Sequence, residues 1–394
     1  MKKILAGIRI LDFSRYVAGP YCATLLGFLG AEVIRVERPG GGDDRDIAPV
    51  AEDGTGSVFL QTGCNKKSLC LKLGKPESKP IVDRLIQTAD VVVCNFPPPA
   101  QQKLGFDYAS LKQLKDDIIL ANVTAFGTTG PLANQGGFDG VAQALSGAML
   151  MTGRDGEPVK SAAPYADYSS AVMLAFGVLA ALRERDQSGQ GQEVSASLLG
   201  TALAVFNSHL VEQSALGLNR EGTGNRVQTS GPSDVFATTD GHILVHCPGN
   251  AIFKRWTELI GKPEWQDDPR FATDQLRGDH RDILCEPMAH WCAQRSSEES
   301  LHDLAAAGVP AGPVLSMQET LAHPQVAALG ALSEVSYPGA PTAQVADLPL
   351  QFSHSETGIE QRPPTVGEHT QACLSELGFS DAEIAEFAQQ QIIA

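Results

Sequence analysis

One carboxylate in this sequence is placed where it could do chemistry. Asp167 lies in the stretch SAAPYADYSSAVMLAFG and is the last charged residue before a long apolar run. An aspartate at the start of a helix often serves as an N-cap that accepts a backbone N–H. The small residues around Asp167 also leave room for a ligand, so that its carboxylate could act as a nucleophile or a base. The residues alone leave both interpretations open.

Other catalytic and cofactor motifs are missing from the chain. The sequence contains no G-x-G-x-x-G, no phosphate-binding G-x-x-x-x-G-K-[ST], no G-x-S-x-G and no H-E-x-x-H. Gly19-Pro20 follows the first apolar strand, and such a helix start suits an anion better than a dinucleotide. His242 and His246 are about 13 Å apart if they lie on one strand, which is too far for one ion. We therefore predict no metal site and no nicotinamide cofactor.

The composition predicts an acidic globular protein. Lys+Arg 30 against Asp+Glu 46 gives a net charge of −16, and 43% of the 394 residues are hydrophobic. A surplus of anions argues against a nucleic-acid partner, because phosphate backbones are bound by clustered Lys and Arg. The early apolar stretch is interrupted by Arg9 and Asp12, so no signal peptide and no membrane segment are expected. The eight cysteines form no C-x-x-C pair, so reduced, buried thiols and a cytoplasmic location are predicted.

Alternating strand and helix patterns predict the element that must position Asp167. Short apolar strands at 7–13, 31–37, 67–73, 91–96 and 118–126 are separated by helical stretches at 21–30, 78–89 and 110–116. Strands joined through helices favour right-handed crossovers and a parallel sheet. Long apolar helices are expected at 169–185 and 196–213. This part of the chain is therefore predicted to be α/β.

The rest of the chain predicts a second domain. A hairpin is expected in VFATTDGHILVHC around Asp240-Gly241, followed by a more polar helical stretch at 253–307. We predict a large α/β domain at 1–200 for ligand binding and the nucleophile, and a linker at 201–224. A small α+β domain follows at 225–312. A segment at 313–394, with one closing helix at 380–391, is expected to return to the large domain.

Several long motifs resemble the class III CoA-transferase family. They are GIRILDFSRYVAGPYCATLLGFLGAEVIRVERPGGGD, CNKKSL, VCNFPPPAQQKLGFDY, GTTGPLANQGGFDGVAQALSGAMLMTG and ADYSSAVMLAFGVLAAL. The resemblance runs in order along the whole chain, through DGHILVHCPGNAIFKRW and GVPAGPV. It implies a large Rossmann-like parallel-sheet domain with a smaller α+β domain, in an interlocked homodimer. It implies no cofactor, since CoA esters are themselves the substrates.

The resemblance implies a covalent role for Asp167. Its carboxylate would attack an acyl-CoA to give a mixed anhydride, and the CoA thiolate would then form an aspartyl-CoA thioester. The implied CoA contacts are Val17, Ala18, Arg38, Leu71, Lys72, Leu73, Gly74, Asn95, Phe96, Lys103, Gln135, Gly136, Gly137 and Phe138. Arg38, Lys72 and Lys103 would give this acidic protein a local basic patch for the CoA phosphates.

Departures from the family pattern narrow the implied substrate. Formyl-CoA transferase carries a glutamine at the position of Val17 and a tryptophan near Ala48, which argues against oxalate here. The racemase branch carries a histidine at the position of Phe138, and racemisation needs two acid/base groups. The expected reaction therefore moves CoA from succinyl-CoA to a C4–C5 dicarboxylate such as itaconate or mesaconate. Arg15 and Arg226 are candidate clamps for the second carboxylate.

Two alternatives to CoA transfer stay open from the sequence. One is an acyl-CoA racemase or isomerase of the same superfamily, and the other is a protein that binds acyl-CoA without catalysis. A covalent adduct on Asp167 would distinguish a transferase from a binder. The acceptor acid, and whether CoA moves within one dicarboxylate or between two acids, are not determined by the sequence.

Overall fold

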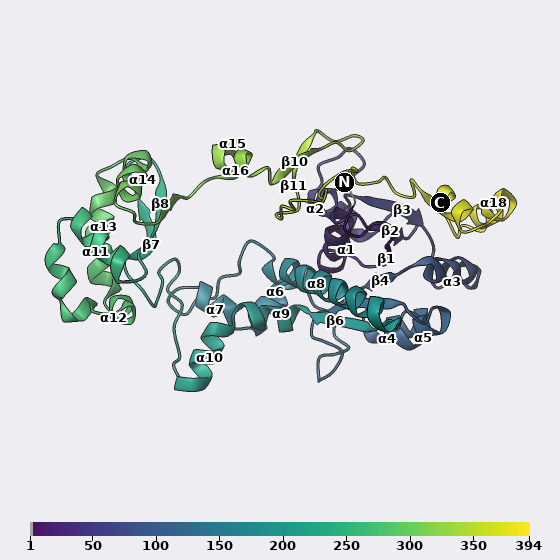
Figure 1. Ribbon diagram of the computed structural model, residues 1–394, viewed down its shortest axis with the longest axis horizontal. Helices are drawn as coiled ribbons and strands as arrows, with labels where there is room; N and C mark the ends of the chain where they lie inside the picture. The colour runs from purple at the N-terminus through teal and green to yellow at the C-terminus, as the bar shows by residue number, and fades with distance from the viewer. Residues whose placement is uncertain (1–2) are drawn as a thin grey trace. The chain divides into compact units, whose positions relative to one another are not determined.

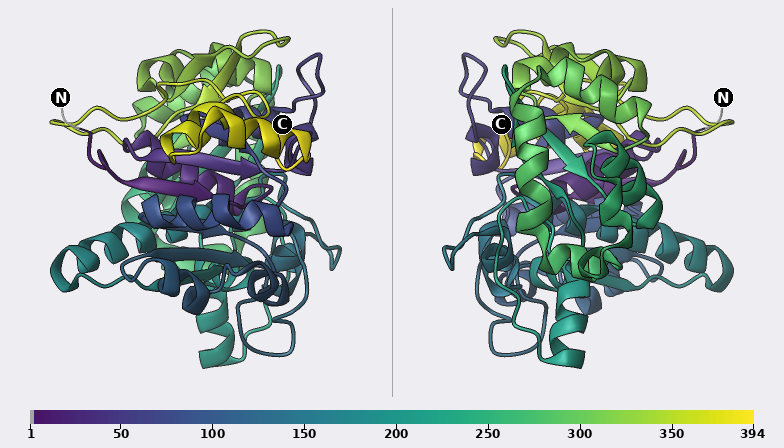
Figure 2. Two further views of the ribbon diagram at one scale, coloured as in Figure 1. Left: turned by 90° about the vertical axis from the view of Figure 1, so that its right-hand side faces the viewer. Right: turned by 90° about the vertical axis from the view of Figure 1, so that its left-hand side faces the viewer.

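The computed structural model describes residues 3–394, which divide into two compact units. Unit 1 comprises residues 1–146, 161–216 and 327–394, and unit 2 comprises 147–160 and 217–326. Unit 1 therefore contains both ends of the chain, and the C-terminal helices lie beside the N-terminal strands (Figures 1 and 2). Backbone hydrogen bonds join them, since Lys72 donates to Ile392 at 2.8 Å and His369 donates to Ser68 at 2.9 Å.

A six-stranded parallel sheet forms the centre of unit 1, in the order β3-β2-β1-β4-β5-β6. Its strands are β1 (Arg9–Asp12), β2 (Glu32–Glu37), β3 (Lys66–Cys70), β4 (Val91–Cys94), β5 (Ile119–Thr124) and β6 (Glu193–Ser197). The first five lie where apolar runs predicted them. The sixth was not predicted, because three of its five residues, Glu193, Ser195 and Ser197, are polar and the strand contains no apolar run.

Helices cover both faces of this sheet. One face carries α1 (Ala18–Phe28), α8 (Tyr165–Ser188) and α9 (Leu198–Val205). The other carries α3 (Lys79–Thr88), α5 (Tyr108–Leu114), α17 (Thr370–Glu376) and α18 (Asp381–Gln389). In β4, Val91 and Val93 face the first layer while Val92 and Cys94 face the second. Because successive side chains of a strand point to opposite faces, a sheet covered twice needs uninterrupted apolar strands.

Smaller elements complete unit 1. They are α2 (Ser57–Thr62), α4 (Pro98–Leu104), α6 (Asp139–Leu145), α10 (Asn207–Leu216) and the antiparallel pair β10 (Leu332–Val335) and β11 (Ala343–Ala346). The single helix expected at 196–213 is wrong, because α9 ends at Val205 and α10 begins at Asn207. Residues 201–216, expected to belong to a linker, thus lie in α9 and α10, with only Phe206 between the two helices, and are part of unit 1.

Helix α8 has the length and composition of a membrane span, with a mean hydropathy of 1.4 over its most apolar window. The sequence prediction excluded only uninterrupted apolar runs and did not identify this helix as a candidate. In unit 1, α8 packs against α1, β5, β6 and α9, so its buried face is part of the protein core. Its buried positions include Ala171, Leu174, Ala175 and Val178, which recur at helical spacing.

Unit 2 has its own sheet and core. Strands β7 (Ser233–Ala237), β8 (His242–His246) and β9 (Ala311–Pro313) form an antiparallel sheet in the order β7-β8-β9. The predicted hairpin around Asp240-Gly241 is confirmed, and β9 adds a third strand that the sequence did not reveal. The helices are α7 (Ala148–Thr152), α11 (Asn250–Leu259), α12 (Asp274–Asp279), α13 (Arg281–Ala293), α14 (Ser297–Ala306) and α15 (Met317–Ala322), with α16 (Pro324–Leu329) at the boundary. Trp256, Phe271 and Leu304 are among the buried core residues.

All eight cysteines are buried and free, as predicted. Burial raises the pKa of the Cys94 thiol to about 12. These thiols are therefore protonated at neutral pH and serve as packing groups.

Candidate active site

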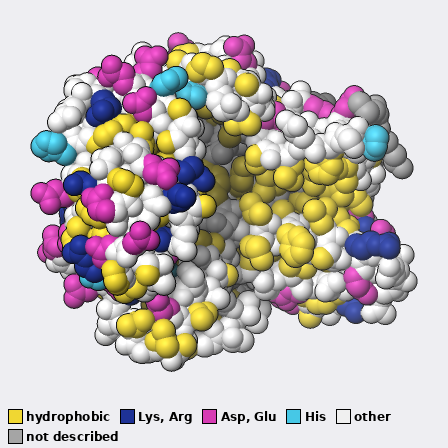
Figure 3. Space-filling model, turned by 60° about the vertical axis from the view of Figure 1, so that its left-hand side comes forward, with side chains coloured by type: hydrophobic (Ala, Val, Ile, Leu, Met, Phe, Trp, Pro, Cys, Tyr) yellow, Lys and Arg dark blue, Asp and Glu magenta, His cyan; other side chains and the backbone are white. Residues whose placement is uncertain are grey.

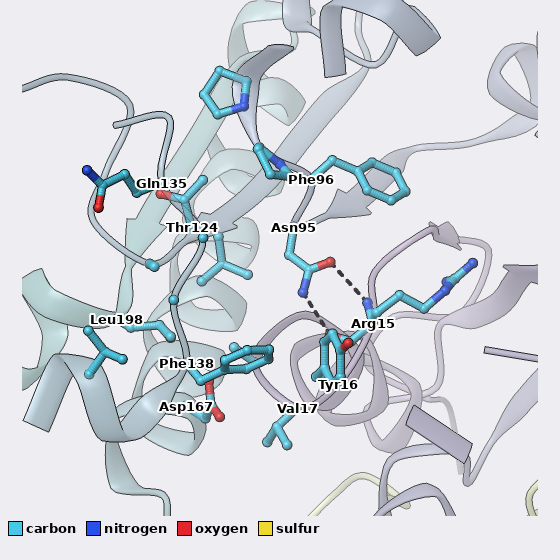
Figure 4. A pocket seen from close by; sticks show the side chains of 18 of the residues that line it. Arg15, Tyr16, Val17, Asn95, Phe96, Thr124, Gln135, Phe138, Asp167 and Leu198 are labelled. Carbon is cyan, nitrogen blue, oxygen red and sulfur yellow. Dashed lines mark hydrogen bonds between the residues drawn. The ribbon is translucent and has the colours of Figure 1, made fainter. Parts of the chain in front are cut away.

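A pocket of about 440 Å³ opens at the carboxyl ends of β1, β4, β5 and β6 in unit 1 (Figure 4). The strand order reverses between β1 and β4, and open α/β sheets bind ligands at such a crevice. Asn95 and Phe96 follow β4, Thr124 ends β5 and Leu198 follows β6. The position of the pocket therefore follows from the topology of the sheet.

Asp167 lies in the first turn of α8 and lines this pocket. It is not the N-cap, because the N-cap position is occupied by Pro164, which provides no side-chain cap. The first of the two interpretations left open by the sequence is therefore wrong. In Figure 4 the Asp167 carboxylate lies below the ring of Phe138, with Val17 at its side.

The electrostatic environment of Asp167 is unusual for an aspartate. Burial, followed by the negative charge of Asp139, raises the pKa of the Asp167 carboxyl to about 7. A carboxylate with this pKa is a stronger base than one in water, and it still ionises near neutral pH. Perturbed carboxyls in a pocket are candidates for catalytic groups.

The loop after β1 forms the opposite wall of the pocket. Tyr16 has a φ of 69°, a left-handed conformation that is rare for an aromatic residue. Its backbone N–H donates to Asp44 at 3.2 Å. The Tyr16 ring packs edge-on against Phe138, with ring centroids 5.2 Å apart at 87°. Strained backbone that its surroundings hold in place is common at ligand-binding sites.

A buried network of charges lies beneath this loop. Lys66 donates to Asp12 at 2.8 Å, and both side chains are fully buried. Arg35 pairs with Asp44 at 2.7 Å, which links the strand β2 to the residue that holds Tyr16. Paired buried charges fix geometry strongly, because breaking one pair leaves a charge without compensation.

The structure brings nine of the predicted site residues together around this pocket. They are Val17, Ala18, Asn95, Phe96, Gln135, Gly136, Gly137, Phe138 and Asp167. Gly137 approaches the end of β5 so closely that a Cβ atom there would meet Ala125 at 2.9 Å. Position 137 therefore needs glycine for this packing.

The remaining predicted residues lie elsewhere in unit 1. Leu73, Gly74 and Lys103 line a second hollow of about 500 Å³, together with Lys75 and Lys79. Leu71 is fully buried and Lys72 is exposed, and neither lines this hollow or the first pocket. The Arg38 side chain is exposed and pairs with Asp43.

The two candidate acid clamps are already engaged. Arg15 donates through its guanidinium to the carbonyls of Phe13, Ser14 and Val36, and its side chain points away from Asp167 in Figure 4. Arg226 belongs to unit 2, where it pairs with Asp234 at 2.8 Å and Asp282 at 2.5 Å. Arg15 thus supports the loop it belongs to, and Arg226 joins β7 to α13.

Several lining residues were not expected from the sequence. They include Tyr16, Pro97, Pro98, Val123, Thr124, Ala125, Ala133, Val141 and Leu198. Most follow directly from the rule that ligands bind at the carboxyl ends of parallel strands. The rule could not place Leu198, because strand β6 itself was not predicted.

Within residues 3–394, no group of three or more His, Cys, Asp or Glu side chains is arranged to hold a metal ion. In unit 2, the segment Cys247–Asn250 leads into α11, with Gly249 as the N-cap, and the Gly249 N–H donates to both oxygens of Asp274 at 3.0 and 2.8 Å. This segment is therefore held within its own unit by the first turn of α12.

The fold is that of an α/β protein with a partly buried carboxylate, Asp167, in the pocket at the switch point of its parallel sheet. Comparison with known proteins gives the family. CoA-transferase family III matches residues 5–370, and the chain belongs to that family. It is an enzyme that transfers CoA.

Relatives cover nearly the whole chain. The succinyl-CoA--D-citramalate CoA-transferase of Chloroflexus aurantiacus is 31% identical over 99% of this chain and 98% of its own. The human succinyl-CoA:glutarate CoA-transferase is 30% identical over 99% of this chain and 90% of its own. Among solved structures, a CaiB/BaiF family protein from Brucella suis superimposes with a TM-score of 0.84 at 30% identity, over 96% of this chain and 100% of that one.

Proposed function

We propose that this protein transfers CoA from succinyl-CoA to a C4–C5 dicarboxylate, such as itaconate or mesaconate, with Asp167 as covalent nucleophile. The observation that carries the proposal is one partly buried carboxylate, with a pKa of about 7, in the pocket at the switch point of the sheet. The donor and the acceptor class are supported by the two relatives, which are named for succinyl-CoA with citramalate and with glutarate.

The proposed reaction proceeds by exchange of acyl bonds at Asp167. A carboxylate oxygen of Asp167 forms a bond to the thioester carbonyl carbon, and the C–S bond breaks, so that CoA leaves as a thiolate. The thiolate sulfur then attacks the Asp167 carbonyl carbon of the mixed anhydride, and succinate leaves with the electron pair. The acceptor carboxylate attacks the aspartyl-CoA thioester, and the same two steps run in reverse.

Each tetrahedral intermediate carries an oxyanion that must be stabilised. Gly136 and Gly137 bring backbone to the wall of the pocket that holds Asp167, and backbone N–H groups are suitable donors. A Cβ built on Gly136 would meet nothing within 4 Å, so that this backbone is open to an approaching ligand. We assign the oxyanion-binding role to this segment.

The two hollows of unit 1 fit the two ends of a CoA ester. Helix α4 connects them, because Pro98 lines the pocket with Asp167 while Lys103 lines the second hollow. At 1.5 Å per residue, its seven residues span about 10 Å. We assign the thioester to the first pocket and the phosphates to the second, where Lys75, Lys79 and Lys103 supply positive charge.

We further propose that the active protein is a homodimer in the cytoplasm and that it needs no metal or redox cofactor. Helix α10 buries none of its residues in the single chain. On α8, Val172, Met173 and Phe176 are 52%, 52% and 67% exposed, and Figure 3 shows hydrophobic side chains gathered over a broad area of one face. Exposed apolar area on this scale is typical of an interface, and a second copy of the chain is the proposed partner.

The test of the proposed function is the mass of the intact protein after incubation with succinyl-CoA. Wild type is expected to gain a CoA-sized adduct that hydroxylamine removes, whereas Asp167→Asn and Asp167→Ala gain none. A panel of C4–C5 dicarboxylates then identifies the acceptor through release of the adduct. Binding of succinyl-CoA without any adduct would overturn the transferase chemistry and favour a non-catalytic binder, and exchange of the α-hydrogen without an adduct would favour a racemase.

A further inference from the structure

The N-terminus of α8 is capped by a residue from another helix. Asp139, the first residue of α6, accepts the N–H of Ala166 at 2.8 Å and that of Asp167 at 3.3 Å, both through Oδ1. The local N-cap residue, Pro164, offers no side-chain acceptor. Because the first N–H groups of a helix have no partner within the helix, Asp139 satisfies donors that would otherwise be left unpaired.

The second carboxylate oxygen of Asp139 also accepts a hydrogen bond. Gln143, one turn further along α6, donates through Nε2 to Asp139 Oδ2 at 2.6 Å. The other end of the same amide accepts the Ser161 N–H at 3.0 Å. Asp139 is 6% exposed and Gln143 is 1% exposed, so both side chains are fixed inside unit 1. The result is a rigid connection from α6 to the turn that carries Asp167.

Besides its hydrogen bonds, Asp139 carries a negative charge that repels the ionised carboxylate of Asp167. Both carboxylates lie at the same helix end, and burial limits the screening of their repulsion by water. In the proposed half-reaction, the Asp167 carboxylate becomes a neutral anhydride and then a neutral thioester, while the negative charge leaves on succinate. Repulsion from Asp139 is present before this conversion and absent after it.

We propose that Asp139 is a positioning residue for CoA transfer, which holds the turn bearing Asp167 and, by its charge, favours the acylated form of Asp167 over the free carboxylate. This inference rests on the proposed function. It predicts that the equilibrium between free enzyme plus succinyl-CoA and aspartyl-CoA enzyme plus succinate depends on the charge at position 139.

The experiment measures that equilibrium in mixtures of succinyl-CoA and succinate of fixed ratio, by intact mass. In Asp139→Asn, the ratio of CoA-bearing to free enzyme is expected to fall about tenfold, which corresponds to one unit of carboxyl pKa. The matched control is Gln143→Ala, which removes a partner of Asp139 but keeps the charge, and its ratio is expected to stay within about twofold of wild type. Equal ratios in wild type and Asp139→Asn would overturn the proposal.

A second variant distinguishes an effect of the charge at position 139 from an effect of disturbed folding. In Asp139→Asn the new amide N–H₂ faces the Gln143 amide N–H₂, so the connection to Ser161 is disturbed. The double variant Asp139→Asn/Gln143→Glu keeps every hydrogen bond and moves the negative charge away from the α8 N–H groups. It is expected to fold like wild type and still show the lowered ratio. A wild-type ratio in this variant would also overturn the proposal.

A readout without substrate separates this inference from the proposed function. The effect of Asp139→Asn on the urea unfolding midpoint at pH 8 is measured in wild type and in Asp167→Asn. We expect Asp139→Asn to lower the unfolding midpoint more in the Asp167→Asn background. In the wild-type background the same substitution also removes the repulsion between the two carboxylates, which offsets part of the lost stability. If the two substitutions are coupled but no CoA adduct forms, the transferase chemistry is refuted and the electrostatic role of Asp139 is not. If an adduct forms but the substitutions are not coupled, the role of Asp139 is refuted.

Discussion

The amide of Asn95 forms two hydrogen bonds with the backbone of Arg15. The Arg15 N–H donates to Asn95 Oδ1 at 3.0 Å, and Asn95 Nδ2 donates to the Arg15 carbonyl at 2.7 Å (Figure 4). The pair joins the loop after β1 to the loop after β4, across the point where the strand order reverses. Asn95 lines the pocket, where it is predicted to contact CoA, and its amide also holds the wall on which Tyr16 and Val17 lie.

Replacing Asn95 by alanine should weaken both the fold and substrate binding. Loss of two hydrogen bonds to partly buried backbone should lower the free energy of unfolding by about 1–3 kcal/mol. The KM for succinyl-CoA should rise several-fold, because Tyr16 and Val17 lose their support. Urea unfolding and initial rates measure the two effects. Asn219→Ala, at an exposed position, is the control and should change neither; an unchanged KM in Asn95→Ala would contradict the positioning role.

The rate of CoA transfer should rise with pH through about 7. The pKa of the Asp167 carboxyl is raised to about 7 by burial and by the charge of Asp139, and only the ionised form attacks a thioester. A profile of kcat/KM against pH for the free enzyme should therefore show an acid limb with a midpoint near 7. An acid limb near pH 4 would show that Asp167 titrates as an ordinary aspartate.

The raised pKa of the Asp167 carboxyl should also make the free energy of unfolding depend on pH. Because the folded protein holds the Asp167 proton more tightly than the unfolded chain, its stability contribution is complete at low pH and is lost as the pH rises from about 4 to about 7. The side chain at position 167 does not titrate in the Asp167→Asn variant. The free energy of unfolding of the variant, relative to that of wild type, should therefore increase from pH 5 to pH 8. A shift of about three units corresponds to at most about 4 kcal/mol. Urea unfolding at several pH values tests this, and a constant difference would contradict it.

Breaking the buried ion pair between Lys66 and Asp12 should lower the free energy of unfolding substantially. Lys66→Met leaves Asp12 buried without its partner, and it also removes the bond from Lys66 to the Pro20 carbonyl. A loss of about 3–5 kcal/mol is expected in urea unfolding. Lys79→Met, which removes an exposed ion pair with Asp83, should lose no more than about 0.5 kcal/mol. Equal losses in the two variants would refute the buried pair as a stabilising contact.

A charge on the outward face of α8 should prevent self-association. Phe176 is 67% exposed in the single chain, and Phe176→Glu would place a charge in the proposed interface. Sedimentation should show the mass of two chains for wild type and of one chain for the variant. Leu350→Glu, at an exposed position outside α8 and α10, should leave the dimer intact. A monomeric wild type would refute the dimer.

Most of the parallel sheet could be predicted from the sequence, because its central strands are buried on both faces. β4 (Val91–Cys94) is apolar at every position and β5 (Ile119–Thr124) at four of six, and such runs can be recognised in the sequence without knowing the neighbouring strands. The hairpin at Asp240-Gly241 and the closing helix α18 could be predicted for a different reason, because turn residues and a helix-capping sequence such as the one at Ser380 are local signals. The motifs around Asp167 identified the candidate nucleophile and the family.

Only the tertiary structure decided which polar groups meet. Strand β6 (Glu193–Ser197) has a polar sequence and becomes a strand by pairing with β5 at the edge of the sheet. Asp139 precedes Ala166 by 27 residues, and Asn95 follows Arg15 by 80. Apolar periodicity reports what a segment buries by itself, whereas a hydrogen bond across the fold depends on where the chain returns. The candidate nucleophile could therefore be predicted from the sequence, and the residues that position it and set its electrostatic environment could not.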